Sequence, residues 1–134
     1  WIHSVDSAHL ASKLGSAAKN LSKTVNVLLE VNISGEESKF GLHAFDDVKQ
    51  VAEAVLAESS LRLRGLMTMA EFNAGESRIR ATFAGLRAMR DRLETELRVP
   101  LPELSMGMSS DFEEAIAEGS TLVRIGTAIF GGRS

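Results

Sequence analysis

Two segments near the end of the chain carry residue types that suit the binding of a phosphate group. Residues 105–111 (SMGMSSD) place small residues and hydroxyls directly before a predicted helix, where the backbone N–H groups of the first turn attract anions. Ser109 or Ser110 could also cap that helix, and the two roles are compatible. In the second segment, Gly126 permits close approach of the backbone to a ligand, and Thr127 adds a hydroxyl.

A charged residue stands two positions before that glycine. Arg124 lies in a stretch of Leu, Val and Ile, and a permanent cation in such a strand needs an anion or another acceptor as its partner. Other polar residues at the expected strand ends are less specific. We expect His3 to be a packed or hydrogen-bonded histidine, and Lys39, which follows two glutamates, to be a solvated surface cation.

The elements that would position these residues alternate between strand and helix. Apolar, β-branched runs predict strands, and apolar residues at a spacing near 3.6 predict helices. Strands are expected at residues 2–5, 24–33, 61–69, 103–108 and 122–125, and helices at residues 8–18, 45–57, 76–97 and 109–118. This alternation predicts parallel strands with right-handed crossovers, and hence an α/β fold.

The composition describes an ordinary globular chain and excludes several classes of function. Fifteen basic residues against 18 acidic ones give a net charge of −3, and there are six Phe, one Trp and no Tyr, so a nucleic-acid binder is not expected. The absence of cysteine excludes disulfides and thiolate chemistry. No apolar run approaches the roughly 20 residues that cross a bilayer, and no signal peptide is recognisable. We expect a cytoplasmic protein that does not bind membranes.

Five strands suffice for an open sheet but are too few for an eight-stranded barrel. In (β/α) barrels, phosphate is commonly held by the loops after strands seven and eight. If the two candidate segments occupy those positions, the five strands here correspond to strands four to eight. Residues 1–134 are then expected to form a single domain that is the C-terminal part of a barrel of the TIM type.

Five motifs give the sequence a resemblance to a known family. Residues 2–7 (IHSVDS), 31–41 (VNISGEESKFG), 64–69 (RGLMTM), 104–109 (LSMGMS) and 123–131 (VRIGTAIFG) resemble, in order and spacing, the pyridoxal phosphate (PLP) homeostasis proteins. That family is similar in fold to the N-terminal barrel of alanine racemases. The resemblance covers essentially the whole chain. It implies a cytoplasmic protein that binds PLP and acts in vitamin B6 homeostasis as a carrier or regulator without catalytic turnover.

The resemblance also implies roles for individual residues. Ser109, Gly126 and Thr127 would hold the phosphate of PLP, and Arg124 would face the pyridine nitrogen. Because a guanidinium stays protonated, it would keep that nitrogen unprotonated and make the ring a poorer electron sink. Lys39 matches a basic position near the cofactor in the racemases and is a secondary candidate for cofactor binding.

Two departures from the family pattern stand out. Met69 occupies the position at which racemases carry a histidine, which argues against racemase activity. The lysine that forms the Schiff base with PLP in this family lies on the first barrel strand, so the resemblance implies that it is not in this chain. A racemase- or isomerase-type enzyme that grips phosphate, and a truncated or engineered half-barrel without activity, remain alternative hypotheses. The two open edges of a five-stranded sheet predict pairing with the N-terminal barrel segment or self-association.

Overall fold

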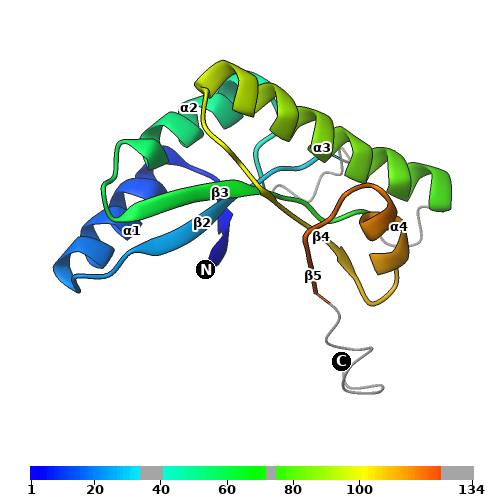
Figure 1. Ribbon diagram of the computed structural model, residues 1–134, viewed down its shortest axis with the longest axis horizontal. Coiled ribbons are helices and arrows are strands. Elements are labelled where there is room, and N and C mark those ends of the chain that lie inside the picture. The colour runs from blue at the N-terminus through cyan, green and yellow to red at the C-terminus, as the bar shows by residue number, and fades with distance from the viewer. Residues whose placement is uncertain (34–40, 72–74, 125–134) are drawn as a thin grey trace.

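The computed structural model describes residues 1–33, 41–71 and 75–124 of the 134-residue chain. Strands and helices alternate from end to end (Figure 1). The order is β1 (Ile2–Val5), α1 (Ala8–Asn20), β2 (Val25–Glu30), α2 (Phe45–Leu56), β3 (Leu61–Met67), α3 (Glu76–Leu97), β4 (Glu103–Met108), α4 (Phe112–Ala117) and β5 (Leu122–Arg124). The predicted α/β class is therefore confirmed.

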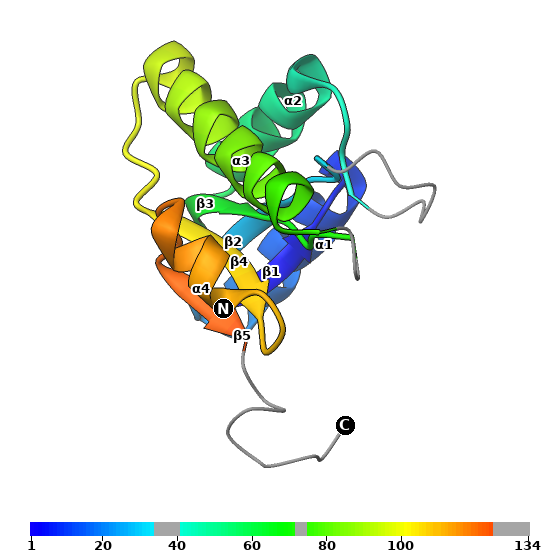
Figure 2. The ribbon, with the colours of Figure 1, turned by 90° about the vertical axis from the view of Figure 1, so that its right-hand side faces the viewer.

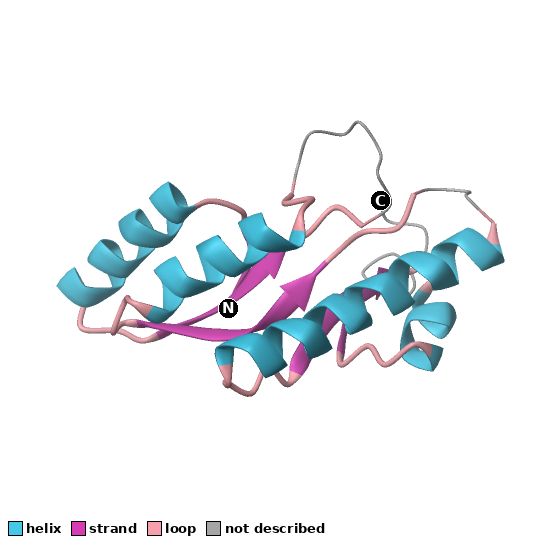
Figure 3. Ribbon diagram, turned by 90° about the horizontal axis from the view of Figure 1, so that it is seen from above, coloured by secondary structure: helices cyan, strands magenta, loops and turns pink. Residues whose placement is uncertain are grey.

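All five strands are parallel and lie in the order in which they occur in the chain, β1-β2-β3-β4-β5. Right-handed crossovers that always step to the next strand place every helix on the same side of the sheet. One apolar core accordingly joins the inward faces of the helices to one face of the strands, including Val27, Leu104, Val51, Phe83 and Ala115. The helices form a layer over that face, as the views from the side and from above show (Figures 2 and 3).

The other face of the sheet is concave. Within the strands the polar residues Glu30 and Ser105 alternate with core residues and so point to this face. His3 Nδ1 lies 2.9 Å from Ser105 Oγ, although β1 and β4 are separated by β2 and β3. In a flat sheet those two strands would be about 14 Å apart, beyond the reach of a histidine and a serine. The contact requires a sheet that curls as in a barrel, and the five strands form half of one.

Several helix ends follow from local chemistry. Ser7 caps α1 by accepting a hydrogen bond from Leu10 N at 3.0 Å. Arg98 adopts a left-handed conformation and ends α3 ahead of Val99-Pro100, while Gly119, with a φ of 102°, follows α4. On α2 the apolar residues that follow a spacing near 3.6, Val48, Val51, Ala52 and Val55, are all buried.

Three predicted elements exceed the observed ones by more than a single residue, for specific reasons. The strand expected over residues 24–33 ends at Glu30 because Leu42 returns to this point, donating to Glu30 O and accepting from Asn32 N. The strand expected over residues 61–69 ends at Met67, and the next residue, Thr68, donates its hydroxyl to Val31 O at 2.6 Å. The helix expected to begin at residue 109 begins at Phe112 instead, after a hydrogen-bonded turn.

The edges of the sheet lead to a prediction about assembly. Among the described residues β1 and β5 have no strand on their outer sides, and unpaired edges are prone to recruit further strands. We expect the isolated chain to self-associate. Size-exclusion chromatography with multi-angle light scattering should give a mass that rises with concentration above the 14.4 kDa of one chain. A monomer at every concentration that unfolds in a single cooperative transition would contradict this expectation.

None of the helices that the structure describes is both long enough and apolar enough to cross a membrane.

Candidate functional site

Arg124 ends β5 beside the last residue of β4. The two strands are parallel, and Arg124 pairs in register with Met108, the residue before Ser109. Its neighbour Val123 faces α4 across Gly107, so Arg124 points to the concave face. Nε and Nη2 of Arg124 are buried, and in the part of the chain that the structure describes they have no hydrogen-bond partner. The described residues therefore do not supply an acceptor for these two donors of the cation.

Ser109 lies in a tightly closed turn between β4 and α4. Met108 N donates to Asp111 Oδ1 at 2.6 Å, and Asp111 N donates to Met108 O at 3.1 Å. The turn is therefore closed by hydrogen bonds in both directions around Ser109 and Ser110. Asp111 is only 8% exposed, so its short bond to the backbone is shielded from water and holds the turn firmly.

Gly107 gives β4 the shape that the turn requires. Its φ is 106°, and a Cβ on this residue would lie 2.6 Å from Ala115 Cβ, so α4 packs directly on the glycine backbone. The pairing of β4 with β5 shifts register across this point, between Ser105 and Met108. The irregularity brings Met108 level with Arg124 and leaves Ser109 at the carboxyl end of the sheet.

Hydroxyl groups hold the start of β5 against β4. Leu104 N donates to Thr121 Oγ1 at 2.8 Å, and Thr121 N donates to Leu104 O at 3.0 Å. Ser120 Oγ donates to Met106 O at 2.7 Å. These bonds fix the position from which β5 carries Arg124 to the end of the sheet.

His3 and Ser105 meet on the concave face close to Arg124. Ser105 is fully buried, and the 2.9 Å contact between its Oγ and His3 Nδ1 gives both side chains a partner. Burial, together with the positive charges of Arg124 and the N-terminal amine, lowers the pKa of His3 below its ordinary value of 6.5. His3 is thus neutral at pH 7 and lies beside the guanidinium without adding a second positive charge.

Glu30 brings an acidic group to the same face. Burial and the neighbouring carboxylate of Asp6 raise the pKa of Glu30 above its ordinary value of 4.5, and Arg124 partly offsets the rise. Arg124 therefore acts on titratable groups from both β1 and β2. Among the described residues, Arg124 thus lies near a neutral imidazole, His3, and a carboxyl group, Glu30, which in turn lies near Asp6.

The pKa of His3 predicts how stability depends on pH. A histidine whose folded pKa is depressed binds fewer protons in the folded state, so its contribution to stability is lost as the pH falls below about 6.5. Glu30, whose folded pKa is raised, acts in the opposite direction, because its contribution is lost as the pH rises above about 4.5. A variant that lacks His3 separates its contribution to the pH dependence of stability from that of Glu30.

We expect His3→Gln to reduce the loss of unfolding free energy between pH 7 and pH 5, measured by urea unfolding at several pH values. His9→Gln, on the exposed side of α1, is the matched control and should keep the slope of the unsubstituted chain. An identical pH profile for His3→Gln and the unsubstituted chain would show that His3 is not destabilised as a cation in the folded state.

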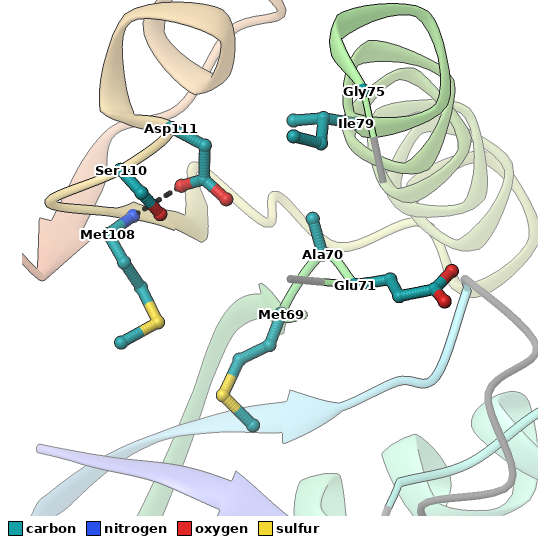
Figure 4. Close-up of a pocket in the computed structure, with 8 residues that line it drawn as sticks. All are labelled: Met69, Ala70, Glu71, Gly75, Ile79, Met108, Ser110 and Asp111. Atoms are coloured by element: carbon teal, nitrogen blue, oxygen red, sulfur yellow. Dashed lines mark hydrogen bonds between the residues drawn. The ribbon is translucent and has the colours of Figure 1, made fainter. Parts of the chain in front are cut away.

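A separate cavity of about 400 Å³ opens at the carboxyl ends of β3 and β4, between the first turns of α3 and α4 (Figure 4). Its walls include Met69, Ile79 and Met108, and its polar groups come from Glu71, Ser110 and Asp111. No lysine or arginine is among its described lining residues. Because the Asp111 carboxylate and no cation of the described lining face it, this cavity is poorly suited to a phosphate group. The residues predicted to hold phosphate are not in its described lining.

The structure brings together two of the five residues predicted to bind the cofactor. Ser109 and Arg124 lie at the ends of neighbouring parallel strands, whereas Lys39, Gly126 and Thr127 lie outside the described residues. His3 is a hydrogen-bonded histidine, as predicted. Its partner Ser105 and the turn-closing Asp111 are not predictable in these roles, since neither contact leaves a periodic signal in the sequence.

Comparison with known proteins gives consistent matches over the whole chain. The family model described as "Alanine racemase, N-terminal domain" matches residues 1–134. A pyridoxal phosphate homeostasis protein of Pseudomonas aeruginosa is 47% identical over 133 residues, which cover 99% of this chain and 56% of that protein. The protein of the same name from Aquifex aeolicus is 43% identical, with coverage of 98% and 58%.

A solved structure matches as well. PipY of Synechococcus elongatus, determined with PLP bound, superposes with a TM-score of 0.87 and 35% identity over 98% of this chain and 60% of its own. The chain spans less than two thirds of the length of each of these three relatives.

Proposed function

Because the chain belongs to the pyridoxal phosphate homeostasis family, within the larger family of alanine racemase N-terminal domains, we propose that it binds PLP at the carboxyl ends of β4 and β5. The observation that carries the proposal is Arg124. Its Nε and Nη2 are buried on the concave face, without a partner among the described residues. Burying donors of a cation in this way is unfavourable unless an acceptor completes the site.

The chemistry of PLP fits this arrangement. When bound, PLP supplies a phosphate dianion, an aldehyde and an aromatic pyridine ring whose nitrogen can accept a hydrogen bond. Arg124 donates toward the ring nitrogen and, because a guanidinium stays protonated, favours the unprotonated form of that nitrogen. The neutral state of His3 keeps a second cation away from Arg124 and the ring.

Ser109, Gly126 and Thr127 form the proposed phosphate site. Ser109 contributes from the turn that Asp111 closes, and a rigid turn loses little conformational entropy when it binds an anion. Gly126 and Thr127 follow Arg124 by two and three residues, so the same strand end would deliver both the ring contact and part of the phosphate contact. Lys39 is a secondary candidate for a contact with the cofactor.

We further propose that the chain acts as a carrier or regulator of PLP rather than as an enzyme. Arg124 weakens the ring as an electron sink, which suits storage and delivery of the cofactor better than carbanion chemistry. Met69, in the position where the resemblance places a racemase histidine, is 45% exposed and offers no proton to a substrate. We propose that none of the lysines in this chain is the family's PLP-anchoring lysine, so that binding here is non-covalent.

The experiment that tests this function is a titration with PLP followed by absorbance and by quenching of the fluorescence of Trp1, the only tryptophan. We expect saturable binding of PLP, weaker binding of pyridoxal, which lacks the phosphate, and no specific covalent adduct after borohydride treatment. Equal affinity for PLP and pyridoxal, or no saturable binding of either, would overturn the proposal. A single lysine adduct formed in stoichiometric yield would overturn its non-covalent part.

A further inference from the structure

We propose that the cavity between α3 and α4 binds an alkylammonium group, with Asp111 as the counter-ion and a wall of methionine and isoleucine around the alkyl chain. The cavity lies outside the residues assigned to PLP, so this inference does not depend on the proposed function. Its volume of about 400 Å³ is within the range of small-molecule sites, which combine apolar walls with a few placed polar groups.

The charge in the cavity comes from a buried carboxylate whose bonding is incomplete. Asp111 is only 8% exposed. Its Oδ1 accepts a hydrogen bond from Met108 N at 2.6 Å, which accounts for the closed turn. The second oxygen has no hydrogen bond to any residue that the structure describes, and Figure 4 shows it pointing away from Met108 N into the cavity. Because so little of this side chain is exposed, a cationic donor that enters the cavity would stabilise the charge of the carboxylate.

The other charged groups nearby do not supply that cation. Glu71 lies at the rim, where its Oε2 forms an ion pair with Arg78 Nη2 at 3.0 Å, so the charge of Glu71 is already balanced. Arg78 is itself largely exposed. The described lining contains no basic side chain, so within the described part of the chain no cation faces the Asp111 carboxylate across the cavity.

The walls favour a ligand that also has an apolar part. Met69 and Met108 extend from the ends of neighbouring strands, and each is 45% exposed, which is unusual for such large apolar side chains. Ile79 projects into the cavity from the first turn of α3 (Figure 4). Flexible thioether side chains adapt readily to an alkyl chain, so a primary alkylammonium would satisfy the carboxylate and cover the methionines at once.

The test uses n-butylammonium chloride as the ligand and n-butanol as its neutral counterpart, at ionic strength matched with sodium chloride. The five methionines, labelled with ¹³C at the methyl group, are the probes in NMR spectra. We expect saturable shifts of the Met69 and Met108 signals with n-butylammonium and much smaller shifts with n-butanol. Met67 and Met106, which are buried, should not move and report on the integrity of the fold.

Two substitutions decide whether Asp111 and the cavity are responsible. Asp111→Asn keeps an oxygen to accept from Met108 N but removes the charge, and should weaken n-butylammonium binding roughly tenfold or more. Glu71→Gln, at the ion-paired rim, is the matched control and should bind nearly as well as the unsubstituted chain. If Asp111→Asn perturbs the Met67 and Met106 signals, Ile79→Phe replaces it, because the larger ring fills the cavity while Asp111 stays in place.

Equal shifts with n-butanol and n-butylammonium would overturn the inference, because they would show that the cavity recognises only the alkyl chain. Undiminished binding of n-butylammonium by a folded Asp111→Asn variant, or by Ile79→Phe, would overturn it as well.

Discussion

Arg124→Met is expected to stabilise the chain in the absence of ligand and at the same time to weaken its binding of PLP. Nε and Nη2 of Arg124 are buried without a partner among the described residues, and an unsatisfied buried donor costs about 1–3 kcal/mol. Methionine has a similar unbranched shape and no donor to satisfy. We therefore expect urea unfolding to give a free energy about 1–2 kcal/mol higher for the variant.

The same substitution should raise the dissociation constant of PLP by a factor of about 10 to 100, since a hydrogen bond from a charged donor contributes roughly 1.5–3 kcal/mol. Arg124→Lys should keep part of the affinity because it retains the charge but not the planar donor. Replacing a residue whose role is binding should raise the stability of the free chain and lower its affinity for PLP, as expected here.

Arg64 offers a matched control for this experiment. It is a second arginine of the sheet with a buried and unpartnered Nε in the described part of the chain, but it lies near Glu103 and Trp1 instead of the carboxyl end of β5. Arg64→Met should leave the affinity for PLP unchanged. If Arg124→Met destabilised the free chain and left PLP binding intact, Arg124 would be a structural residue and the proposed site would be wrong.

Gly107→Ala is expected to have the largest effect on stability among the substitutions considered. Two costs combine at this residue, because its φ of 106° is unfavourable for alanine and the new Cβ would lie 2.6 Å from Ala115 Cβ. A strained φ costs about 1–2 kcal/mol, and overpacking a core typically adds about 1–3 kcal/mol. We expect urea unfolding to show a loss of about 2–5 kcal/mol, together with weaker PLP binding as the turn around Ser109 is displaced.

Gly75→Ala separates the cost of the backbone conformation from the cost of overpacking. Gly75 has a similar φ of 91°, but a Cβ there would have no atom within 4 Å. Only the cost of the backbone conformation applies, so the loss should be about 1–2 kcal/mol and PLP binding should be retained. Equal losses for the two variants would mean that α4 can move away from β4 at little cost, which would contradict a rigid turn at Ser109.

The class of fold and much of the core follow from the sequence. Continuous apolar runs with β-branched residues mark strands buried within a parallel sheet, and the bounds of β4 and α3 agree with the predicted ones. The buried face of α1 is less evident from the sequence, in which Ala8, Leu10, Leu14, Ala17 and Ala18 follow a spacing near 3.6. Leu14 and Ala18 do face the core, but Ala8 and Ala17 are exposed and the small residues Ala11 and Gly15 are buried instead. Small residues let a helix approach its neighbours closely, so hydrophobicity alone does not locate its buried face.

The candidate site can be predicted only in part, because strand order follows from the sequence but the curvature of the sheet does not. Position along the chain and strand order place Ser109 beside Arg124, because the carboxyl ends of parallel strands share one edge of the sheet. The contact between His3 and Ser105 depends on the curvature of the sheet, which brings residues 102 positions apart within 2.9 Å. No spacing in the sequence encodes that curvature. The bond from Met108 N to Asp111 Oδ1 replaces the first turn of a helix that the sequence pattern favoured.

The most direct test of the proposed PLP site is to map binding residue by residue on the ¹⁵N-labelled chain. On addition of PLP, we expect the largest backbone amide shifts at Ser109 and its neighbours in the β4–α4 turn and at Arg124, Gly126 and Thr127. In Arg124→Met the shifts of both segments should require PLP concentrations about 10 to 100 times higher. Shifts confined to exposed lysines, or to residues on the helix-covered side of the sheet, would contradict a site at the carboxyl ends of β4 and β5.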